Sequence, residues 1–338
     1  MKKNASIQKK KREGAALIIA LWVLMILSII VGSFAFEMQL ESRLVSHKRK
    51  RFQAEVLARS GVEYAKALID QSPKVKELEI EETDDEEGFL QAALYIKRGL
   101  RTSTTIDQGD GSFTVTIQSA EAGRNINRLT REEWLDILEM ANVPSTEWDS
   151  MLDCLQDWID EGDEHKLNGA ESDDPFYENA GYSVKNGPLD SVEELLLVKG
   201  WGPDILYGKE ADEDGDAIFG IAKLLTVWGD GKVNLNTAST NLLLSYAEYE
   251  DWELAGVMEA RNGEDGEEGT LDDGIKSLSD VDADPSKFKL QSDFLKVTSV
   301  GDMFGVQYQI ECIFLLRGDR AIEVYQKEGP VSGNAHAR

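Results

Sequence analysis

The sequence predicts an α+β protein, in which a long N-terminal helix packs on an antiparallel sheet that is interrupted by a large all-helical insertion. Three observations predict this class. An uncharged apolar run continues into a segment with apolar residues at helical spacing. Four segments of alternating polarity, one in the first half of the chain and three at its C-terminal end, predict the strands. Capped amphipathic segments between the first strand and the other three predict the insertion.

The long helix starts in residues 15–36, which carry no charge. A run of about 18 or more apolar residues is typical of a membrane span, and at ~1.5 Å per residue this one covers the ~30 Å hydrocarbon core. Apolar residues then continue at helical spacing to Ile69, and no proline occurs before Pro73. One helix from 15 to 69, roughly 80 Å long, is therefore expected, with its first half in lipid and its second half on a soluble domain.

A basic cluster, Lys9 to Arg12, stands before Gly14 and favours a cytoplasmic N-terminus. In a secretory signal peptide the small residues of the cleavage site follow a shorter apolar core. Here the small residue precedes the apolar run, so a cut after Gly14 removes the charged leader and keeps the helix. An uncleaved signal anchor is the alternative. Residues 37–51 also carry five Lys or Arg and two Glu, so charge alone gives a weak orientation.

The predicted sheet combines a strand after the Gly109–Gly111 turn with three C-terminal strands joined by short turns. The first strand must join the other three, because a lone strand does not persist. A short helix is expected over 89–100. The predicted strands are 112–118, 293–300, 306–316 and 320–327, so the insertion covers roughly 123–290.

Helix signals recur through the insertion. Thr130 followed by Glu133 forms a capping box for a helix over 130–142, and Ser145 is expected to cap a second helix over 145–159. Three further helices are predicted, over 191–199 before the Gly200-Trp201-Gly202-Pro203 turn, from about Thr240, and over 252–261.

The composition is strongly acidic, with 63 Asp and Glu against 36 Lys and Arg and a net charge of −27. Such a surface repels phosphate backbones, so nucleic-acid binding by the soluble part is not expected, whereas divalent cations are attracted. The two cysteines, Cys154 and Cys312, lie far apart, one in a helical pattern and one in a strand pattern. Whether they form a disulfide stays open.

A basic leader, a glycine cut site and a long helix that starts in an apolar stretch resemble the type IV pilin-like class. In that class a peptidase cuts after the glycine and methylates the new N-terminus, here Ala15. Most members carry glutamate at the fifth mature position, where this chain has Ile19. A carboxylate at that depth is costly unless it is paired. In the class it is thought to meet the N-terminal amine of the neighbouring subunit, so a subunit without it suits the first position of a fibre.

Three segments in fixed order, 120–130 (AEAGRNINRLT), 155–201 and 233–239 (VNLNTAS), are similar to the minor pseudopilin K family of type II secretion, also called general secretion pathway protein K. The resemblance implies a leader at 1–14, an assembly helix at 15–36 and a pilin-like domain at 37–122 and 291–338. It implies two SAM-like helical domains at 123–215 and 216–290.

The same resemblance implies a place at the pseudopilus tip, in pseudopilus initiation and in protein export across the outer membrane. The implied partners are minor pseudopilins I and J, the major pseudopilin, the prepilin peptidase and the inner-membrane secretion platform. The implied location is the bacterial inner membrane, with a single span and the soluble domain in the periplasm.

The alternative is a membrane-anchored helix-hairpin-helix protein that binds DNA, because VNLNTAS and the Gly200-Trp201-Gly202 turn also look like such hairpins. In those elements glycines let backbone N–H groups approach a phosphate. Acidic residues surround both segments here, so electrostatic repulsion argues against DNA.

An acidic stretch after residue 156 offers oxygen ligands, and relatives of this family bind calcium. Calcium takes six to eight oxygens, often from carboxylates in a flexible loop. We expect a calcium site that uses some of Asp160, Asp163, Glu171 and Asp173, and the alternative is a solvated acidic loop. The acidic loops 211–220 and 262–274 are weaker candidates. In the loop 211–220, Ala217 stands where an EF-hand loop needs glycine, and no glutamate closes the loop.

No catalytic motif is present: the sequence lacks G-x-S-x-G, H-E-x-x-H and a P-loop, and its histidines, His47, His165 and His336, are isolated. Acidic pairs such as Asp157 and Asp160 lie among many other acids. The chain is therefore not expected to be an enzyme.

Overall fold

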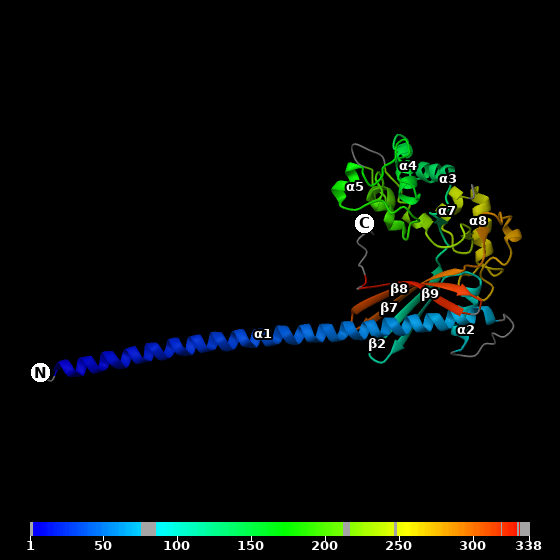
Figure 1. The fold of residues 1–338 in the computed structure, drawn as a ribbon. Coiled ribbons are helices and arrows are strands. Elements are labelled where there is room, and N and C mark those ends of the chain that lie inside the picture. The colour runs from blue at the N-terminus through cyan, green and yellow to red at the C-terminus, as the bar shows by residue number, and fades with distance from the viewer. Residues whose placement is uncertain are drawn as a thin grey trace.

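The computed structural model describes the backbone of residues 3–75, 86–211, 217–246, 249–318, 320–329 and 331, and the side chains within these ranges from Leu17 onward, except those of residues 86 and 87. Helix α1 runs from Lys3 to Gln71 as a single rod, whose N-terminal part projects far from the rest of the protein (Figure 1). The predicted long helix is confirmed. It is followed by the short 3₁₀ helix η1, Ser72–Lys74, and by α2, Glu86–Lys97.

The central sheet has five antiparallel strands in the order β1-β2-β7-β8-β9. The predicted join between the early strand and the C-terminal meander is confirmed, since β2 pairs directly with β7. Strand β1 was not predicted, because its sequence TSTTIDQ has almost no apolar alternation. The strands are β1 Thr102–Gln108, β2 Gly111–Ser119, β7 Phe294–Met303, β8 Val306–Arg317 and β9 Arg320–Gly329.

The second half of α1 packs on one face of this sheet through small side chains. Any side chain at Gly61 would overlap Ser299 Oγ and contact Val115 and Phe113 of the sheet. Ser299 Oγ donates a hydrogen bond of 2.8 Å to the carbonyl oxygen of Ala58. Glycine and alanine therefore let the helix approach the strands closely. The buried side chains of α1, α2 and four strands form one core, with Leu68, Ile69, Ile117, Val297 and Phe314 among its members.

The two ends of the sheet differ. The β1–β2 and β7–β8 turns lie at the end where α1 enters, since Ser112 pairs with Asp302. At the opposite end β2 leads into the insertion and β7 leads out of it, and the Ala120 N–H donates to the carbonyl oxygen of Phe294 at 2.9 Å. The rod and the insertion thus leave the sheet at opposite ends (Figure 1).

The first helical unit is built around buried aromatic residues, including Trp134, Trp158, Tyr177 and Trp201. The capping box of Thr130 and Glu133 is confirmed. The unit contains β3 Arg124–Asn125, α3 Arg131–Met140, α4 Trp148–Ile159, α5 Pro175–Ala180, the 3₁₀ helix η3 Val192–Leu197, α6 Pro203–Tyr207, the 3₁₀ helix η4 Ala222–Leu224 and β4 Leu225–Thr226, which pairs in parallel with β3.

One cap prediction and one helix prediction in this unit were wrong. Ser145 does not cap α4, because the Pro144–Glu147 turn precedes the helix, which begins at Trp148 without a side-chain cap. The segment expected as a helix over 191–199 forms only η3, and the chain turns at Gly200, whose φ of 87° is left-handed.

The second helical unit has a smaller core around Leu235, Leu243, Val257 and Phe288. The first unit's core includes Ile221 and Leu225, which lie beyond the predicted boundary at residue 215. A SAM-like arrangement of both units stays a prediction. The second unit contains β5 Val233–Asn234, α7 Thr240–Tyr246, α8 Asp251–Arg261, the 3₁₀ helix η5 Leu278–Val281 and β6 Phe288–Lys289, which pairs in parallel with β5.

Both cysteines are buried and free, and they belong to different cores. Cys154 lies in the first helical unit and Cys312 lies in the sheet core. The structure therefore shows no disulfide between them.

Candidate functional site

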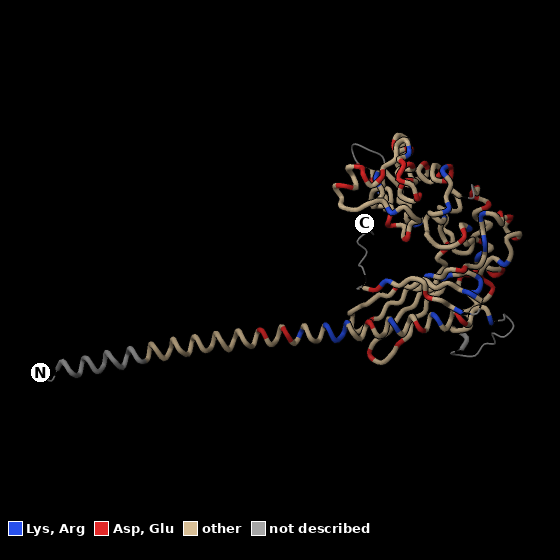
Figure 2. The backbone as a smooth tube through the Cα atoms, viewed as in Figure 1, with Lys and Arg blue, Asp and Glu red and all other residues tan. Residues whose placement is uncertain are grey.

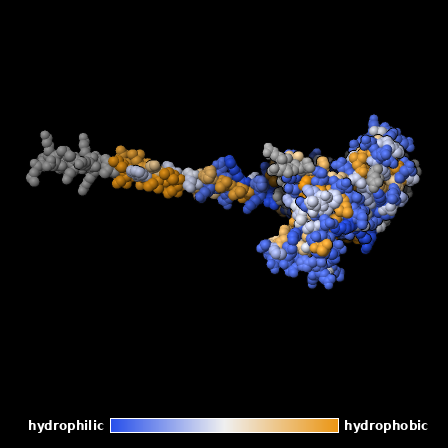
Figure 3. Space-filling view, turned by 90° about the horizontal axis from the view of Figure 1, so that it is seen from above, coloured by the Kyte–Doolittle hydropathy of each residue, from blue (hydrophilic) through white to orange (hydrophobic). Residues whose placement is uncertain are grey.

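The N-terminal half of α1 is an exposed apolar rod. Every side chain from Leu17 to Arg49 is exposed, and the orange surface of this part in Figure 3 is its apolar stretch. Within the described residues, one helix is long and apolar enough to cross a membrane. Such a surface is stable in water only when lipid or other helices cover it.

Ile19 is 63 % exposed on this rod, so it has no partner within its own chain. Its apolar side chain is compatible with lipid, whereas a carboxylate at this place would need a partner from outside. The backbone of α1 is helical through Gly14 and Ala15, but their side chains lie outside the described residues.

The four predicted calcium ligands lie on the loop after α4, but they do not converge. Asp160 pairs with Lys166 at 3.0 Å, and Asp173 contacts His165 at 2.9 Å. Asp163 accepts a long hydrogen bond of 3.5 Å from Asn186. Among the described residues, no three acidic, histidine or cysteine side chains are arranged so that they could hold a metal ion. The first acidic loop among the weaker candidates, at 212–216, lies outside the described residues, as does His336.

Glu171 is the exception within this loop. Its side chain is only 3 % exposed, yet neither carboxylate oxygen has a hydrogen-bond partner. Burial raises the pKa of Glu171, and the negative charges of Asp157 and Asp160 raise it further. A buried carboxylate without partners is unfavourable unless a proton or a cation neutralises it.

Asp157 holds this loop against α4 and was not among the four predicted ligands. It is completely buried and accepts hydrogen bonds from the Lys166 N–H at 3.1 and 3.2 Å. A side chain at Gly169 would collide with its carboxylate. One turn earlier, Asp153 accepts from both nitrogens of Asn168 and pairs with Arg131, and these contacts lower its pKa.

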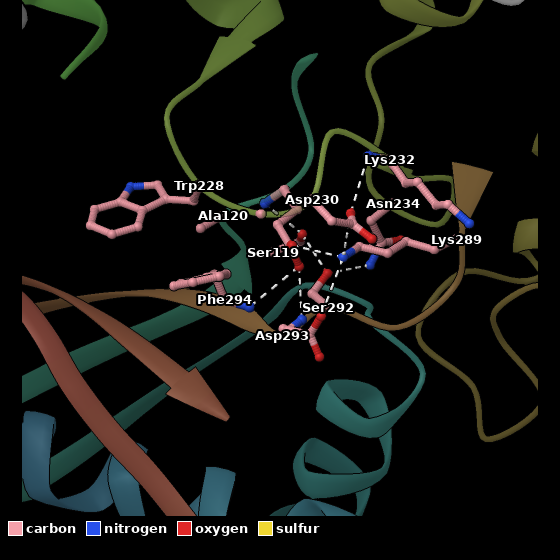
Figure 4. Close-up of polar contacts among 12 residues, drawn as sticks. Ser119, Ala120, Trp228, Asp230, Lys232, Asn234, Lys289, Ser292, Asp293 and Phe294 are labelled. Carbon is pink, nitrogen blue, oxygen red and sulfur yellow. Dashed lines mark hydrogen bonds and ion pairs between the residues drawn. The ribbon is translucent and has the colours of Figure 1, made fainter. Parts of the chain in front are cut away.

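A second polar site, which we call the polar clamp, joins the insertion to the sheet and consists of Glu121, Asp230, Asn234, Lys289 and Ser292. Figure 4 shows Asp230, Asn234, Lys289 and Ser292 close together at this joint. Glu121 is 1 % exposed and accepts from Lys289 Nζ at 2.7 Å and from the Asp293 N–H at 2.7 Å. Burial raises the pKa of Glu121, but these donors favour the carboxylate, and Glu121 and Asp230 raise the pKa of Lys289. The Glu121–Lys289 contact links the segment that enters the insertion to the segment that leaves it.

The VNLNTAS segment serves the same joint. Asn234 Nδ2 donates to Ser292 Oγ at 2.7 Å, and Asn236 Nδ2 donates to the carbonyl oxygen of Arg98 at 2.8 Å. These asparagines tie the second helical unit to the sheet and to the loop after α2. The DNA-binding alternative gains no support from them.

Sequence reasoning missed the clamp, because Glu121 and Lys289 lie at opposite ends of the insertion. The acidic loop before Gly274 also serves a structural purpose. Tyr95 of α2 donates to Asp273 at 2.9 Å, and this burial and contact raise the pKa of Tyr95 to about 12.

Comparisons with known proteins agree with this architecture. A search of curated proteins finds no match. The family model "Type II secretion system (T2SS), protein K" matches residues 115–207. Among solved structures, a chain of the GspK-GspI-GspJ complex from the enterotoxigenic Escherichia coli type 2 secretion system is similar in fold. Its TM-score is 0.52 at 13% identity, over 83% of this chain and 99% of that chain. The resemblance seen in the sequence is thereby confirmed: residues 115–207 match the model of protein K of type II secretion systems, and the fold of the chain is similar to that of the chain from the GspK-GspI-GspJ complex.

Proposed function

We propose that this protein is the tip subunit of a type II secretion pseudopilus, where it takes part in initiation of the fibre and in protein export across the outer membrane. The proposal is supported by the opposite ends at which α1 and the insertion leave the sheet. The rod leaves the sheet at one end, and the two helical units, which we call the crown, are joined to the opposite end and lie beside the sheet (Figure 1). In a shaft each subunit has neighbours on every side, and the crown occupies space that such neighbours need. Only the apex leaves room for it.

Ile19 supports the same position. A subunit in the shaft needs a group that pairs with the amine of the subunit ahead, and an apolar side chain cannot make that pairing. The role is structural, and it needs no catalytic group. Tagged protein should be found at one end of purified filaments by electron microscopy, and an even distribution along them would contradict the tip position.

The rod reaches its mature form through the prepilin peptidase, which cuts between Gly14 and Ala15 and methylates Ala15. The protein sits in the inner membrane of a bacterium as a single-pass protein, with its soluble part in the periplasm. Mass spectrometry of membrane-extracted protein should find N-methylated alanine as the first residue. An intact Met1 would show that the leader is an uncleaved anchor.

Minor pseudopilins I and J are the proposed direct partners, because the chain resembles a protein solved in complex with both. The major pseudopilin and the inner-membrane secretion platform follow as later partners. Full-length protein extracted in detergent should co-purify with pseudopilins I and J from the same bacterium. Recovery of the protein alone, under conditions in which I and J still bind each other, would remove these partners.

Calcium is the proposed ligand of the acidic loop. Glu171 fits this role, since its two buried oxygens lack partners and the charges of Asp157 and Asp160 act on it. These carboxylates, with Asp163 and Asp173 from the same loop, do not converge in the structure. Calcium binding therefore requires the loop to close around Glu171, where the ion would supply positive charge and fix the loop. Calorimetry should detect binding that Glu171→Gln weakens at least tenfold, while Glu161→Gln, an exposed residue of the same loop, leaves it unchanged. No heat of binding in the unsubstituted protein would refute the site.

A further inference from the structure

The charges on α1 change sign at the base of the head. Between Glu41 and Glu55 the helix has no acidic residue, but it carries five cations, which we call the basic collar: Arg43, Lys48, Arg49, Lys50 and Arg51. Figure 2 shows the collar as a blue band where the rod meets the head. In a chain of net charge −27 the collar is one of two dense basic clusters, the other being Lys9 to Arg12.

The collar is not neutralised within the chain. In the part of the molecule that the structure describes, none of its five side chains forms an ion pair, whereas several cations of the head do, as Lys185 and Lys289 show. Lys50 and Arg51 lie over the rings of Phe304 and Tyr308, at 5.3 and 5.9 Å from the ring centres. These contacts leave their positive charge available to an external anion.

An apolar side chain accompanies the collar. Phe304 sits in the β7–β8 turn, at the end of the sheet where α1 enters, and it is 64 % exposed. Phe52, one turn above Lys48 on α1, is also 64 % exposed. The surface of the head that points along the rod therefore combines cations with exposed aromatic rings, a combination typical of protein surfaces that contact membrane interfaces.

The spacing suits a membrane surface. If the apolar run that ends at Phe36 fills the hydrocarbon core, Arg43 lies about 10 Å and Arg51 about 22 Å beyond its edge. The headgroup layer occupies about 5–8 Å of that distance, and long basic side chains extend back towards it. Membrane helices tilt by up to about 40°, and such a tilt reduces the distance of Arg51 from the edge of the hydrocarbon core to about 17 Å. The collar then lies about one screening length from the lipid phosphates at physiological salt.

We infer that the basic collar and Phe304 bind the anionic phospholipid surface on the head's side of the membrane, and so seat the head there before the rod is extracted into a fibre. Anionic lipids attract juxtamembrane Lys and Arg over this distance, and the acidic remainder of the head is repelled, which fixes the end that faces the bilayer. The inference rests on the proposed anchoring of α1 in a membrane.

Energy transfer in nanodiscs tests it with the full-length chain, one copy per disc. A cysteine in place of Gln307, exposed beside Phe304, takes the donor dye, because Cys154 and Cys312 are fully buried, and headgroup-labelled lipid is the acceptor. Discs contain phosphatidylcholine alone or with about a third phosphatidylglycerol. We expect about twofold higher transfer with phosphatidylglycerol, lost when salt rises from about 0.1 M to about 1 M and the screening length falls from about 10 to about 3 Å.

Two variants of equal charge locate the effect. Replacing Lys48, Arg49, Lys50 and Arg51 by glutamine should abolish the dependence on phosphatidylglycerol. The matched control replaces the exposed Arg128, Lys223, Lys276 and Arg320 by glutamine and should retain it. Equal transfer in both lipids, or equal behaviour of the two variants, overturns the inference. So does a lipid effect that appears only after pseudopilin I or J is added, which would make the collar a protein-binding surface. If the chain fails to enter nanodiscs, the anchoring itself is wrong, and the two failures are thus distinguished.

Discussion

The two halves of α1 are one continuous helix with opposite surfaces. From Ala54 onward small residues recur on the sheet-facing side of the helix, where Ala54, Ala58 and Gly61 lie close to the strands and Leu57 is buried beside them. From Leu17 to Phe36 the side chains are large and point outwards on all sides, and a side chain at Gly32 would meet nothing. The half whose partner is in the same chain is thus fitted to a defined surface. The half for which we propose lipid and other subunits as partners is almost entirely apolar, which would allow it to exchange one environment for another.

The sharpest way to break this comparison is to enlarge both glycines. Gly61→Val should lower the free energy of unfolding of the head by about 3 kcal/mol, since the new side chain overlaps Ser299 and Val115. Gly32→Val, the matched control in the exposed half, should leave it unchanged. Thermal and chemical denaturation in detergent would measure both. Equal effects would show that the two halves are not packed differently.

A smaller effect tests whether the crown is held as firmly as α1. Glu121→Gln keeps the acceptor for the Asp293 N–H but deprives Lys289 of its buried carboxylate. We expect a loss of about 1–2 kcal/mol in the free energy of unfolding. Amide hydrogen exchange should become faster in the segments around Glu121 and Lys289, where the chain enters and leaves the insertion. The amides of α1 and of the strands it contacts should stay protected. Loss of protection at α1 would show that clamp and rod are one cooperative unit.

The acidic loop should respond in the opposite direction. Because burial raises the pKa of Glu171, its folded state binds a proton more tightly than its unfolded state, so its charge destabilises the fold above that raised pKa. Without calcium, Glu171→Gln should therefore stabilise the head by about 1 kcal/mol at neutral pH. The gain should shrink as the pH falls through the raised pKa towards the unfolded value. A gain that is independent of pH would assign the effect to packing instead.

The smallest effect on stability is expected at Ile19. Ile19→Glu changes an exposed position, so the melting temperature of the head should shift by less than about 1 °C. Its effect should appear in assembly, as reduced incorporation or as incorporation away from the tip, scored by electron microscopy of tagged filaments. Normal filaments with tip labelling alone would show that the missing carboxylate does not decide the position.

The elements that follow a regular pattern could be predicted from the sequence, and those held by distant contacts could not. Helix α1 and the C-terminal strands were evident from their periodicity. Strand β1 was not, because hydroxyl pairs across to β2 hold it, such as Ser103 with Thr116 at 3.0 Å. Hydrophobic patterns do not record such pairs.

The candidate sites show the same limit. The acidic loop was visible as a cluster of charges, but its decisive feature is that Glu171 is buried without partners, and burial depends on how the loop folds over α4. The clamp needs Glu121 and Lys289 to meet across the whole insertion. Such meetings follow from topology, and the topology is fixed only when β2 pairs with β7.

That pairing has an evolutionary consequence. Since Ala120 and Phe294 are hydrogen-bonded neighbours, the insertion begins and ends at adjacent points of the sheet. Deleting the insertion would leave two adjacent strand ends that an ordinary hairpin turn could close. The insertion can therefore lengthen, shorten or acquire new surfaces while the sheet and helix α1 keep their structure.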